Sequence, residues 1–213
     1  MYFAYGEKET AHLKRKDKKL AAAIDKIGQI ERKTDEDLFS SVVHHIVGQQ
    51  ISTAAQATIW RRLNETLGGI NAAAIGAASV AELQKFGMTF KKAEYIKDFA
   101  AKVQSGEFAI EALAPKTDAE VIAELSALKG IGVWTAEMIM TFCLHRPDVM
   151  SYGDLAIHRG LRMLHRHRKV DRKLFEKYRR RYSPYCTVAS LYLWAIAGGA
   201  IAGLTDPAPK KKP

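Results

Sequence analysis

The chain has 213 residues, of which 47% are hydrophobic and 26% charged, and its formal net charge at pH 7 is +10. A chain of this length and hydrophobic content forms one compact domain or two small lobes. No apolar run reaches the ~18 residues of a membrane-spanning helix, which argues against an integral membrane protein. The excess of lysine and arginine favours a polyanionic partner, nucleic acid first and an anionic membrane second, over an ordinary protein with a charged surface.

The chain has only two cysteines, Cys143 and Cys186, and each lies in an apolar stretch. Two thiols are too few for a four-cysteine zinc site or for an iron–sulfur cluster held by four thiolates. The first twenty residues are polar and basic, unlike a secretory signal. We therefore expect buried free thiols, a reducing intracellular location and no iron–sulfur cluster.

Helix boundaries recur along the whole chain. A capping residue followed three positions later by an acidic residue predicts a helix start, and this pattern occurs as Thr34 with Asp37, Ser79 with Glu82, and Thr117 with Glu120. Glycines predict helix ends at Gly68–Gly69, Gly87, Gly106 and Gly130. A cap with a proline at the first helical position is predicted at Ser183–Pro184. Since apolar residues between these marks recur every three or four positions, the sequence predicts eight to ten short helices and an all-α protein.

Residues 118–145 carry two predicted helices separated by a glycine turn. The first helix covers 118–128 and stops at Lys129–Gly130, and the second runs from Val133 to about His145. Glycine permits the positive φ of a tight turn and the close approach of another backbone. The N–H groups at the start of the second helix favour an anion such as a DNA phosphate. The pattern predicts a helix–hairpin–helix motif, although a simple corner between two helices would carry the same glycines.

A second motif, GDLAIHR, covers residues 153–159 and places Asp154 ahead of another helical pattern. An aspartate in this position is ordinarily an N-cap. Here, however, the motif follows G-I-G-x-W-T-A (130–136) by about twenty residues. Three further segments stand in the same order along the chain: HHIVGQQIS (44–52), FGMTFKKAEYIKDFA (86–100) and SLYLWAIAGG (190–199).

Together these motifs resemble the helix–hairpin–helix DNA glycosylases, and most closely the bacterial 3-methyladenine DNA glycosylase II family with its yeast alkyl-base relatives. The resemblance covers roughly residues 35–200 and corresponds to the short form, without the N-terminal mixed-sheet domain of some members. It implies two helical lobes with the active-site cleft between them, within residues 1–205. The basic, proline-rich segment 206–213 is expected to be a disordered tail.

The resemblance implies that the protein flips a damaged base out of the duplex and excises it. The carboxylate of Asp154 would stabilise the cationic sugar and help to align or deprotonate water. Bifunctional members have a lysine where this chain has Trp134, and an indole forms no Schiff base with the sugar. We therefore expect hydrolysis without strand cleavage, on alkylated bases such as 3-methyladenine and 7-methylguanine. The sequence does not decide whether ethenoadenine, 1-methyladenine and hypoxanthine are also substrates.

The base pocket and the wedge are also implied by the resemblance. Trp134, Trp194 and Met138 would line the pocket, where an aromatic face suits a cationic base; core packing at helical spacing is the alternative for all three. Many relatives have a tyrosine where this chain has Met138. Gln50, with Gln49 beside it, would fill the gap left by the extruded base, unless both merely cap a helix end.

DNA backbone contacts are expected from the hairpin amides of Gly130, Gly132 and Trp134, with help from Thr135. The family also leads us to expect a Na⁺ or K⁺ ion held by backbone carbonyls of Ser126, Leu128 and Ile131, with no other cofactor. Residues 158–181 contain eleven lysines and arginines against two acidic residues, and Arg159 and Arg162 are candidates for phosphate contacts. The segment HRHR (165–168) is not expected to bind metal, because the flanking arginines oppose a cation.

Two other functions remain open from the sequence. One is a bifunctional glycosylase and lyase acting on oxidised bases; the other is a non-catalytic helix–hairpin–helix module that binds lesions. In every case we expect the protein to bind double-stranded DNA and not a membrane. We expect a monomer that works in the bacterial cytoplasm at the nucleoid, or in the nucleus of a eukaryote.

Overall fold

The computed structural model describes residues 1–208 and divides into two compact units. Unit 1 comprises Met1–Thr34 and the described residues from His145 onward, whereas unit 2 comprises Asp35–Leu144. The chain therefore leaves unit 1, builds the whole of unit 2, and returns. The segment 206–213, which was predicted to be a disordered tail, includes residues 209–213, and these lie outside the described residues.

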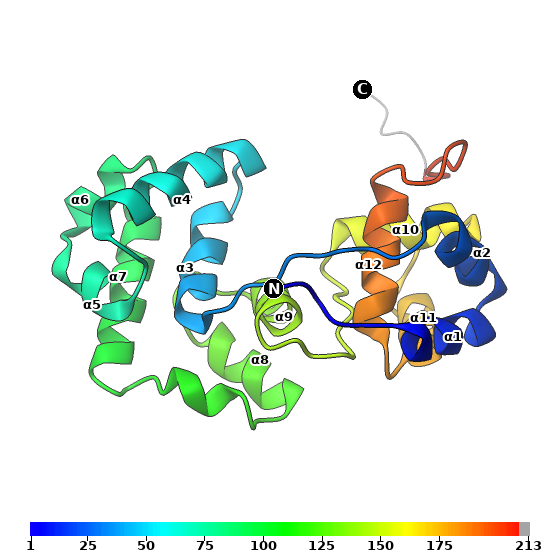
Figure 1. Ribbon diagram of the computed structural model, residues 1–213, viewed down its shortest axis with the longest axis horizontal. Helices are drawn as coiled ribbons and strands as arrows, with labels where there is room; N and C mark the ends of the chain where they lie inside the picture. Colours follow the sequence, from blue (N-terminus) through cyan, green and yellow to red (C-terminus); the bar gives the residue numbers. More distant parts are fainter. Residues whose placement is uncertain (209–213) are drawn as a thin grey trace. The chain divides into compact units, whose positions relative to one another are not determined.

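Unit 1 is built around a buried central helix, α12, which is coloured orange in Figure 1. Gly160 of α10 lies so close to α12 that a Cβ atom there would stand 2.3 Å from the carbonyl oxygen of Leu193. Only glycine allows this approach of the two helices. The helices of unit 1 are α1 (Glu7–Lys16), α2 (Lys18–Ile27), α10 (Leu155–His165), α11 (Arg172–Tyr182) and α12 (Cys186–Ala197).

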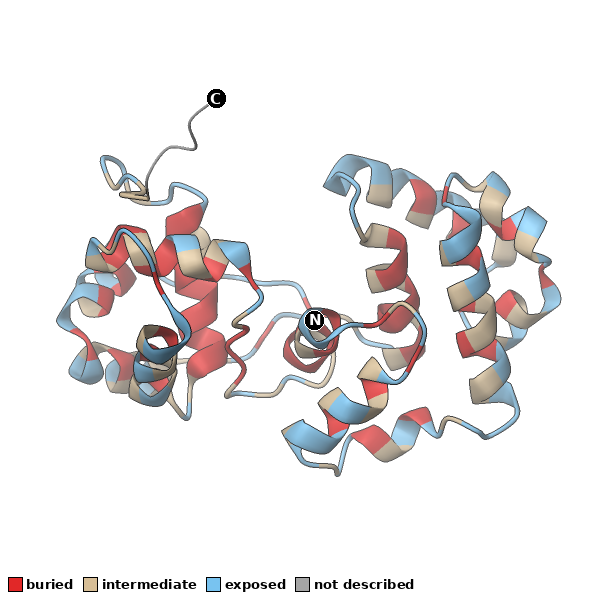
Figure 2. Cartoon of the chain, turned by 180° about the vertical axis from the view of Figure 1, so that it is seen from behind, coloured by how far each residue is buried: buried red, intermediate tan, exposed pale blue. Residues whose placement is uncertain are grey.

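Unit 2 packs its helices around α7, which contacts α3, α5 and α6. The rings of Phe39 on α3 and Phe99 on α7 stack with their centroids 4.9 Å apart, and Figure 2 shows the buried stripes on these helices. The elements of unit 2 are α3 (Leu38–Gly48), α4 (Thr53–Leu67), α5 (Ala72–Ala77), α6 (Val80–Lys85), α7 (Phe90–Gln104), the 3₁₀-helix η1 (Ile110–Leu113), α8 (Asp118–Ser126) and α9 (Val133–Phe142).

The prediction of an all-α protein is confirmed for residues 1–208, where the sole β pairing is an isolated bridge between Tyr2 and Lys33. The predicted count of eight to ten helices is wrong, because this part of the chain has twelve α-helices and one 3₁₀-helix. Short breaks account for the difference. A single residue, Asp17, separates α1 from α2, and its carboxylate accepts the N–H groups of Lys19 and Leu20 at the start of α2.

The predicted caps were right at two places and wrong at two. Ser79 and Thr117 form complete capping boxes, with the carboxylates of Glu82 and Glu120 returning to the cap residues. Thr34, however, caps no helix: the cap of α3 is Asp37, the residue that we expected to be its partner. At Ser183–Pro184 the serine ends α11, and α12 begins only at Cys186, so the proline is not at the first helical position.

Buried polar side chains join α1, α2, α10 and α11 inside unit 1. The carboxylate of Asp17 accepts from a guanidinium nitrogen of Arg181 at 2.8 Å and from the hydroxyl of Tyr182 at 3.1 Å. Burial opposes charge on this carboxylate, but these hydrogen bonds hold the pKa of Asp17 below its ordinary value. His165 lies 3.5 Å from the same carboxylate, and burial lowers its pKa to about 4.

The cysteines are free thiols, as predicted, but only Cys186 is buried and Cys143 is half-buried. Burial raises the pKa of the Cys143 thiol to about 11. Among residues 1–208 no helix combines the length and the apolar character that crossing a bilayer requires.

Candidate functional site

The predicted hairpin is present in unit 2 as α8, a turn over residues 127–132, and α9 (Figure 1). Its helices are shorter than predicted, since α8 ends at Ser126 and α9 ends at Phe142. Gly130 has a φ of +83°, and a Cβ atom there would meet the ring of Tyr95 at 2.3 Å. Both the backbone conformation and the space therefore require glycine at this position.

Gly132 has a different role, because its φ of −97° suits any residue. It is the N-cap of α9 and supplies no side-chain cap, and no atom lies within 4 Å of where its Cβ would be. The start of α9 is therefore open to the approach of an anion. Beside it Val133 is 54% exposed and Trp134 43% exposed, whereas Thr135 is buried, so its hydroxyl is not placed at the surface.

The turn after α3 separates the two glutamines predicted to act as a wedge. Gln49 is the C-cap of α3, and its side-chain amide donates to the carbonyl of Gly130 at 2.6 Å. Gln50 is exposed, and its φ of +55° is rare for a residue other than glycine. Gln49 therefore braces the hairpin turn in this structure, and the wedge role of the two glutamines stays a prediction.

Helix α7 supports both of these turns, which the sequence interpretation did not predict. Lys92 donates to the carbonyls of Val47 and Gln49 at 2.8 and 2.6 Å and so closes the end of α3. One turn later the ring of Tyr95 packs against Gly130. In the next turn Asp98 pairs with Lys129 of the hairpin at 2.7 Å. Lys92, Tyr95 and Asp98 are three positions apart within FGMTFKKAEYIKDFA, and residues at this spacing share a helix face. This spacing was the signal in the sequence that could have identified them as a supporting face.

The predicted monovalent ion is compatible with the residues of the hairpin. The Leu128 carbonyl accepts the N–H of Ile131 at 3.1 Å, and a carbonyl oxygen has a second lone pair that can bind a cation. The hydroxyl oxygen of Ser126 is buried without a hydrogen-bond partner among the described residues. Neutral oxygen donors suit a hard cation such as Na⁺ or K⁺, and the ion itself stays a prediction.

Asp154 is the N-cap of α10 in unit 1 and is 7% exposed. Its Oδ1 accepts the N–H of Ile157 at 2.8 Å, which fixes the side-chain rotamer. Asp154 therefore caps α10 as an ordinary N-cap aspartate does, and its carboxylate is at the same time buried and held in one orientation. The next residue, Leu155, is 84% exposed, so an apolar side chain stands at the surface directly after the carboxylate.

An aromatic cluster holds the turn that carries Asp154. The Tyr152 ring contacts the rings of His158 and Phe175 edge-on, at centroid distances of 4.9 and 5.1 Å. His158 also hydrogen-bonds through Nε2 to the carbonyl of Tyr152 at 2.8 Å, and the guanidinium of Arg172 lies 4.5 Å from the Tyr152 ring centroid. These supporting residues were missed by the sequence interpretation, because they come from α11 as well as from the motif itself.

The other predicted site residues divide between the two units. Trp194 is half-buried against the core of unit 1, whereas Met138 is buried in unit 2. Arg159 is exposed on α10. The guanidinium of Arg162 instead makes two hydrogen bonds to the carboxylate of Asp206, at 2.9 and 2.6 Å. Part of the charge expected for DNA is therefore neutralised within the chain, and Asp206, which we expected to lie in a disordered tail, is held by these two hydrogen bonds.

The histidines of HRHR bond to tyrosines. Nε2 of His165 lies 3.1 Å from the Tyr182 hydroxyl, and Nε2 of His167 lies 2.7 Å from the Tyr178 hydroxyl. These contacts give both imidazoles a structural role.

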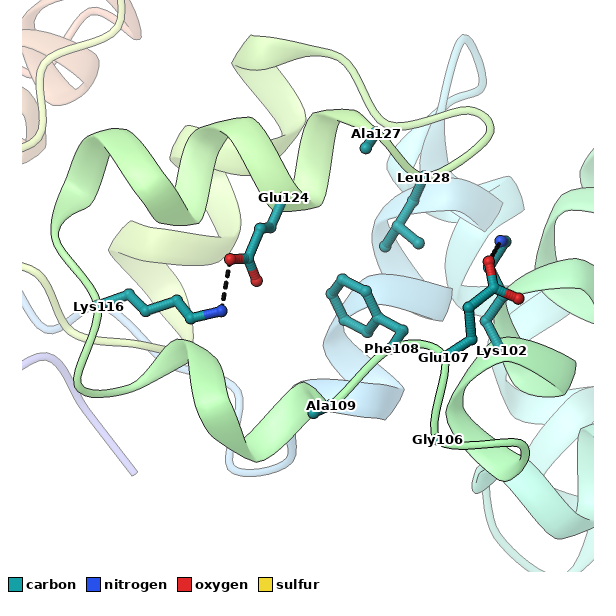
Figure 3. Close-up of a pocket in the computed structure, with 9 residues that line it drawn as sticks. All are labelled: Lys102, Gly106, Glu107, Phe108, Ala109, Lys116, Glu124, Ala127 and Leu128. Carbon is teal, nitrogen blue, oxygen red and sulfur yellow. Dashed lines mark hydrogen bonds and ion pairs between the residues drawn. The ribbon is translucent and has the colours of Figure 1, made fainter.

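A pocket of about 380 Å³ lies in unit 2 between η1, α8 and the end of α7 (Figure 3). Its charged side chains are paired, Lys102 with Glu107 and Lys116 with Glu124. Phe108 and Leu128 form its apolar wall. Of the predicted site residues only Leu128 lines it, so this pocket is distinct from the predicted base pocket.

Residues 43–184, about two thirds of the chain, match the family described as HhH-GPD superfamily base excision DNA repair protein. The chain belongs to this superfamily. The match includes the hairpin and Asp154, so the family recognised from the motifs is confirmed.

Individual relatives agree with this membership. The chain is 36% identical over 128 residues to DNA-3-methyladenine glycosylase 1 of Schizosaccharomyces pombe, which is 59% of this chain and 55% of that protein. The crystal structure of a DNA-3-methyladenine glycosidase from Bacillus halodurans matches with a TM-score of 0.82 and 35% identity over 93% of both chains. A Schizosaccharomyces pombe 3-methyladenine DNA glycosylase in complex with abasic DNA matches with a TM-score of 0.80 and 25% identity, over 92% of this chain and all of that one.

Proposed function

We propose that this chain is a monofunctional DNA glycosylase that removes alkylated bases, such as 3-methyladenine and 7-methylguanine, from double-stranded DNA. The observation that carries the proposal is the buried, hydrogen-bonded Asp154 in a chain that also has an open helix–hairpin–helix turn. The similarity to proteins named as 3-methyladenine glycosylases supports the choice of substrate.

The proposed reaction is hydrolysis of the bond between the base and C1′ of its deoxyribose. The bonding electrons leave with the base, which an alkyl group has already made cationic and hence a good leaving group. Positive charge grows on the sugar, and the carboxylate of Asp154, oriented by its hydrogen bond from the N–H of Ile157, stabilises it. Water adds to C1′ and gives its proton to the carboxylate of Asp154 or to bulk solvent, leaving an abasic site.

The residues of unit 2 would hold the DNA and the extruded base. The start of α9, uncapped by any side chain at Gly132, would bind a backbone phosphate. Ser126, Leu128 and Ile131 would hold the monovalent ion, which when bound supplies positive charge to that phosphate. Gln50 would fill the gap in the duplex, and Trp134 would stack on the flipped base in a pocket that Met138 also lines.

We expect no lyase action, because of the side chain at position 134. A strand-cleaving glycosylase needs an amine that attacks C1′ and forms a Schiff base, and the indole of Trp134 has no such amine. We further propose that the protein acts as a monomer, at the nucleoid of a bacterium or in the nucleus of a eukaryote.

The direct test is incubation of the protein with methylated duplex DNA, followed by analysis of free bases and of the DNA strand. We expect free 3-methyladenine or 7-methylguanine, an intact strand until alkali is added, and no covalent adduct after treatment with borohydride. A trapped adduct would replace this proposal with the bifunctional one. Tight binding to lesion duplex without base release would replace it with a lesion-binding module.

A further inference from the structure

Three side chains of metal-binding type converge in unit 2, apart from the site proposed above. One ligand atom from each of Asp35, His44 and His45 lies within 4.8 Å of the other two. Asp35 stands just before α3, and both histidines are on α3 itself. All three residues are half-buried. Within residues 1–208 no other group of three histidine, cysteine, aspartate or glutamate side chains converges in this way.

Ser41 holds two of the three residues in orientation. Its hydroxyl donates to Oδ2 of Asp35 at 2.6 Å, and its carbonyl lies 2.9 Å from Nδ1 of His45. Because a carbonyl oxygen can only accept, Nδ1 of His45 carries the proton, and Nε2 keeps a lone pair that can bind a cation. Metal-binding histidines ordinarily have their second nitrogen fixed in this way.

The backbone around the group is also fixed. The N–H of Asp35 donates to the carbonyl of Phe142 at the end of α9, at 2.8 Å. The ring of His44 packs edge-on against Trp60 of α4, with the centroids 4.6 Å apart. The carbonyl of His44 accepts from the side chain of Gln56 at 2.9 Å. Contacts with α4 and α9 thus restrict the positions of two of the three residues before any ion is bound.

We propose that Asp35, His44 and His45 bind a divalent first-row transition-metal ion, with Zn²⁺ as the best fit. Two imidazoles and one carboxylate suit such an ion, whereas Mg²⁺ and Ca²⁺ prefer oxygen ligands alone. Zn–N bonds of about 2.0–2.1 Å bring ligand atoms to about 3.4 Å from one another. The ligand atoms, which lie within 4.8 Å of one another, therefore need to approach by about 1.4 Å at most. Water would complete the coordination.

A bound ion would tie the segment before α3 to α3 itself. This link lies at the point where the chain passes from unit 1 into unit 2, between Thr34 and Asp35. It also lies on the helix that ends at the Gln49–Gln50 turn. The site is independent of the proposed glycosylase activity, so the two can fail separately.

The test uses the full chain without an affinity tag, dialysed against Zn²⁺ or Co²⁺. We expect one ion per chain by elemental analysis, visible d–d absorption from Co²⁺, and a higher thermal midpoint with Zn²⁺. Asp35→Asn and His45→Gln each remove a ligand and are expected to weaken binding by about tenfold or more. Ser41→Ala removes the hydroxyl that donates to Asp35 but keeps the backbone carbonyl that accepts from His45, and should weaken binding by roughly tenfold. His12→Gln in unit 1, whose imidazole bonds to the Ser183 carbonyl, is the matched control and should bind as the wild type does.

The proposal is overturned if the wild type retains no ion after dialysis, or if Asp35→Asn and His45→Gln bind the ion as tightly as the control does. Circular dichroism establishes that each variant is folded. Should a ligand variant fail to fold, the wild-type stoichiometry and the milder Ser41→Ala variant decide the matter.

Discussion

The residues proposed to grip DNA in unit 2 and the proposed catalytic carboxylate in unit 1 are presented in opposite ways. In unit 2, Trp134 is 43% exposed at the start of α9, and Gln50 stands in a left-handed conformation at the surface. In unit 1 the carboxylate of Asp154 is 7% exposed and anchored to a backbone N–H. Gripping a duplex requires side chains that reach outward, whereas stabilising a developing cation requires a fixed charge with little water around it.

The supports of the two sets differ as well. The turns of unit 2 are held by one face of α7 through an ammonium, an aromatic ring and a carboxylate, from Lys92, Tyr95 and Asp98. The Asp154 turn is held by aromatic packing among Tyr152, His158 and Phe175. Mostly polar contacts thus position the turns of unit 2, whereas ring packing positions the Asp154 turn of unit 1. Substitutions at the Asp154 turn should therefore change mainly the rate of base release, and substitutions at the turns of unit 2 should change mainly DNA binding.

The largest expected effect is on chemistry in unit 1. Asp154→Asn removes the charge but keeps a good N-cap residue, so base release should fall by about 100-fold or more while DNA binding persists. Asp171→Asn is the matched control: Asp171 caps α11 through an N–H of Leu174 at 2.8 Å, the same geometry as at Asp154. Single-turnover assays and binding titrations measure both quantities. Equal activity of the two variants would remove Asp154 from the mechanism.

In unit 2 the two hairpin glycines should behave differently. Gly130→Ala places a methyl group 2.3 Å from the ring of Tyr95 at a positive φ, and we expect a loss of about 1–3 kcal/mol in the free energy of unfolding. Gly132→Ala meets open space. It should change stability by less than about 1 kcal/mol yet weaken DNA binding, because the methyl group occupies the approach to α9. Denaturant titration and binding assays separate the two outcomes; the opposite pattern would show that the turn is not open as described.

A pH effect should arise in unit 1 from His165. Burial lowers its pKa to about 4, although Asp17 opposes this shift while Lys19, His167 and Arg181 reinforce it. Between pH 6.5, the ordinary pKa, and about 4, the unfolded chain binds more protons than the folded chain, so stability falls as the pH drops. From pH 7 to pH 5 we expect His165 to account for a loss of about 1–2 kcal/mol.

The contribution of His165 is isolated by comparison with His165→Gln. Burial also lowers the pKa of His44 and His45 in unit 2, which acts in the same direction, so the wild type alone does not assign the effect. Thermal denaturation at pH 7 and pH 5 should show a smaller drop for the variant. Identical slopes in both proteins would contradict the assignment.

The smallest expected effect concerns the aromatic wall of unit 2. Trp134→Ala should reduce kcat/KM on a cationic base by about 0.5–2 kcal/mol, roughly 2- to 30-fold. Trp134→Phe should lose less, because it keeps a ring face. On a neutral base such as hypoxanthine the loss should be smaller than on 3-methyladenine, since no cation–π attraction is removed. Equal losses on both bases would assign Trp134 to packing instead.

Much of the fold was predictable because its signals are local. The capping boxes at Ser79 and Thr117 and the left-handed Gly68 at the end of α4 involve residues a few positions apart, and backbone hydrogen bonding acts at that range. Thr34 misled the prediction because Asp37, three positions later, can itself cap a helix. The spacing of three between Lys92, Tyr95 and Asp98 could be seen in the sequence. The contacts of Lys92 with Val47 and Gln49, and of Asp98 with Lys129, could not.

The sequence by itself determined the all-helical class, the glycine turn and the family, since a few ordered motifs such as GIGVWTA and GDLAIHR specify them. Only the tertiary structure decided what each residue touches. It committed Gln49 to the carbonyl of Gly130 and Arg162 to Asp206, and it brought Asp35 to the histidines of α3. The physical reason is range: caps and turns form between neighbours along the chain, whereas these contacts depend on how distant helices pack within each unit.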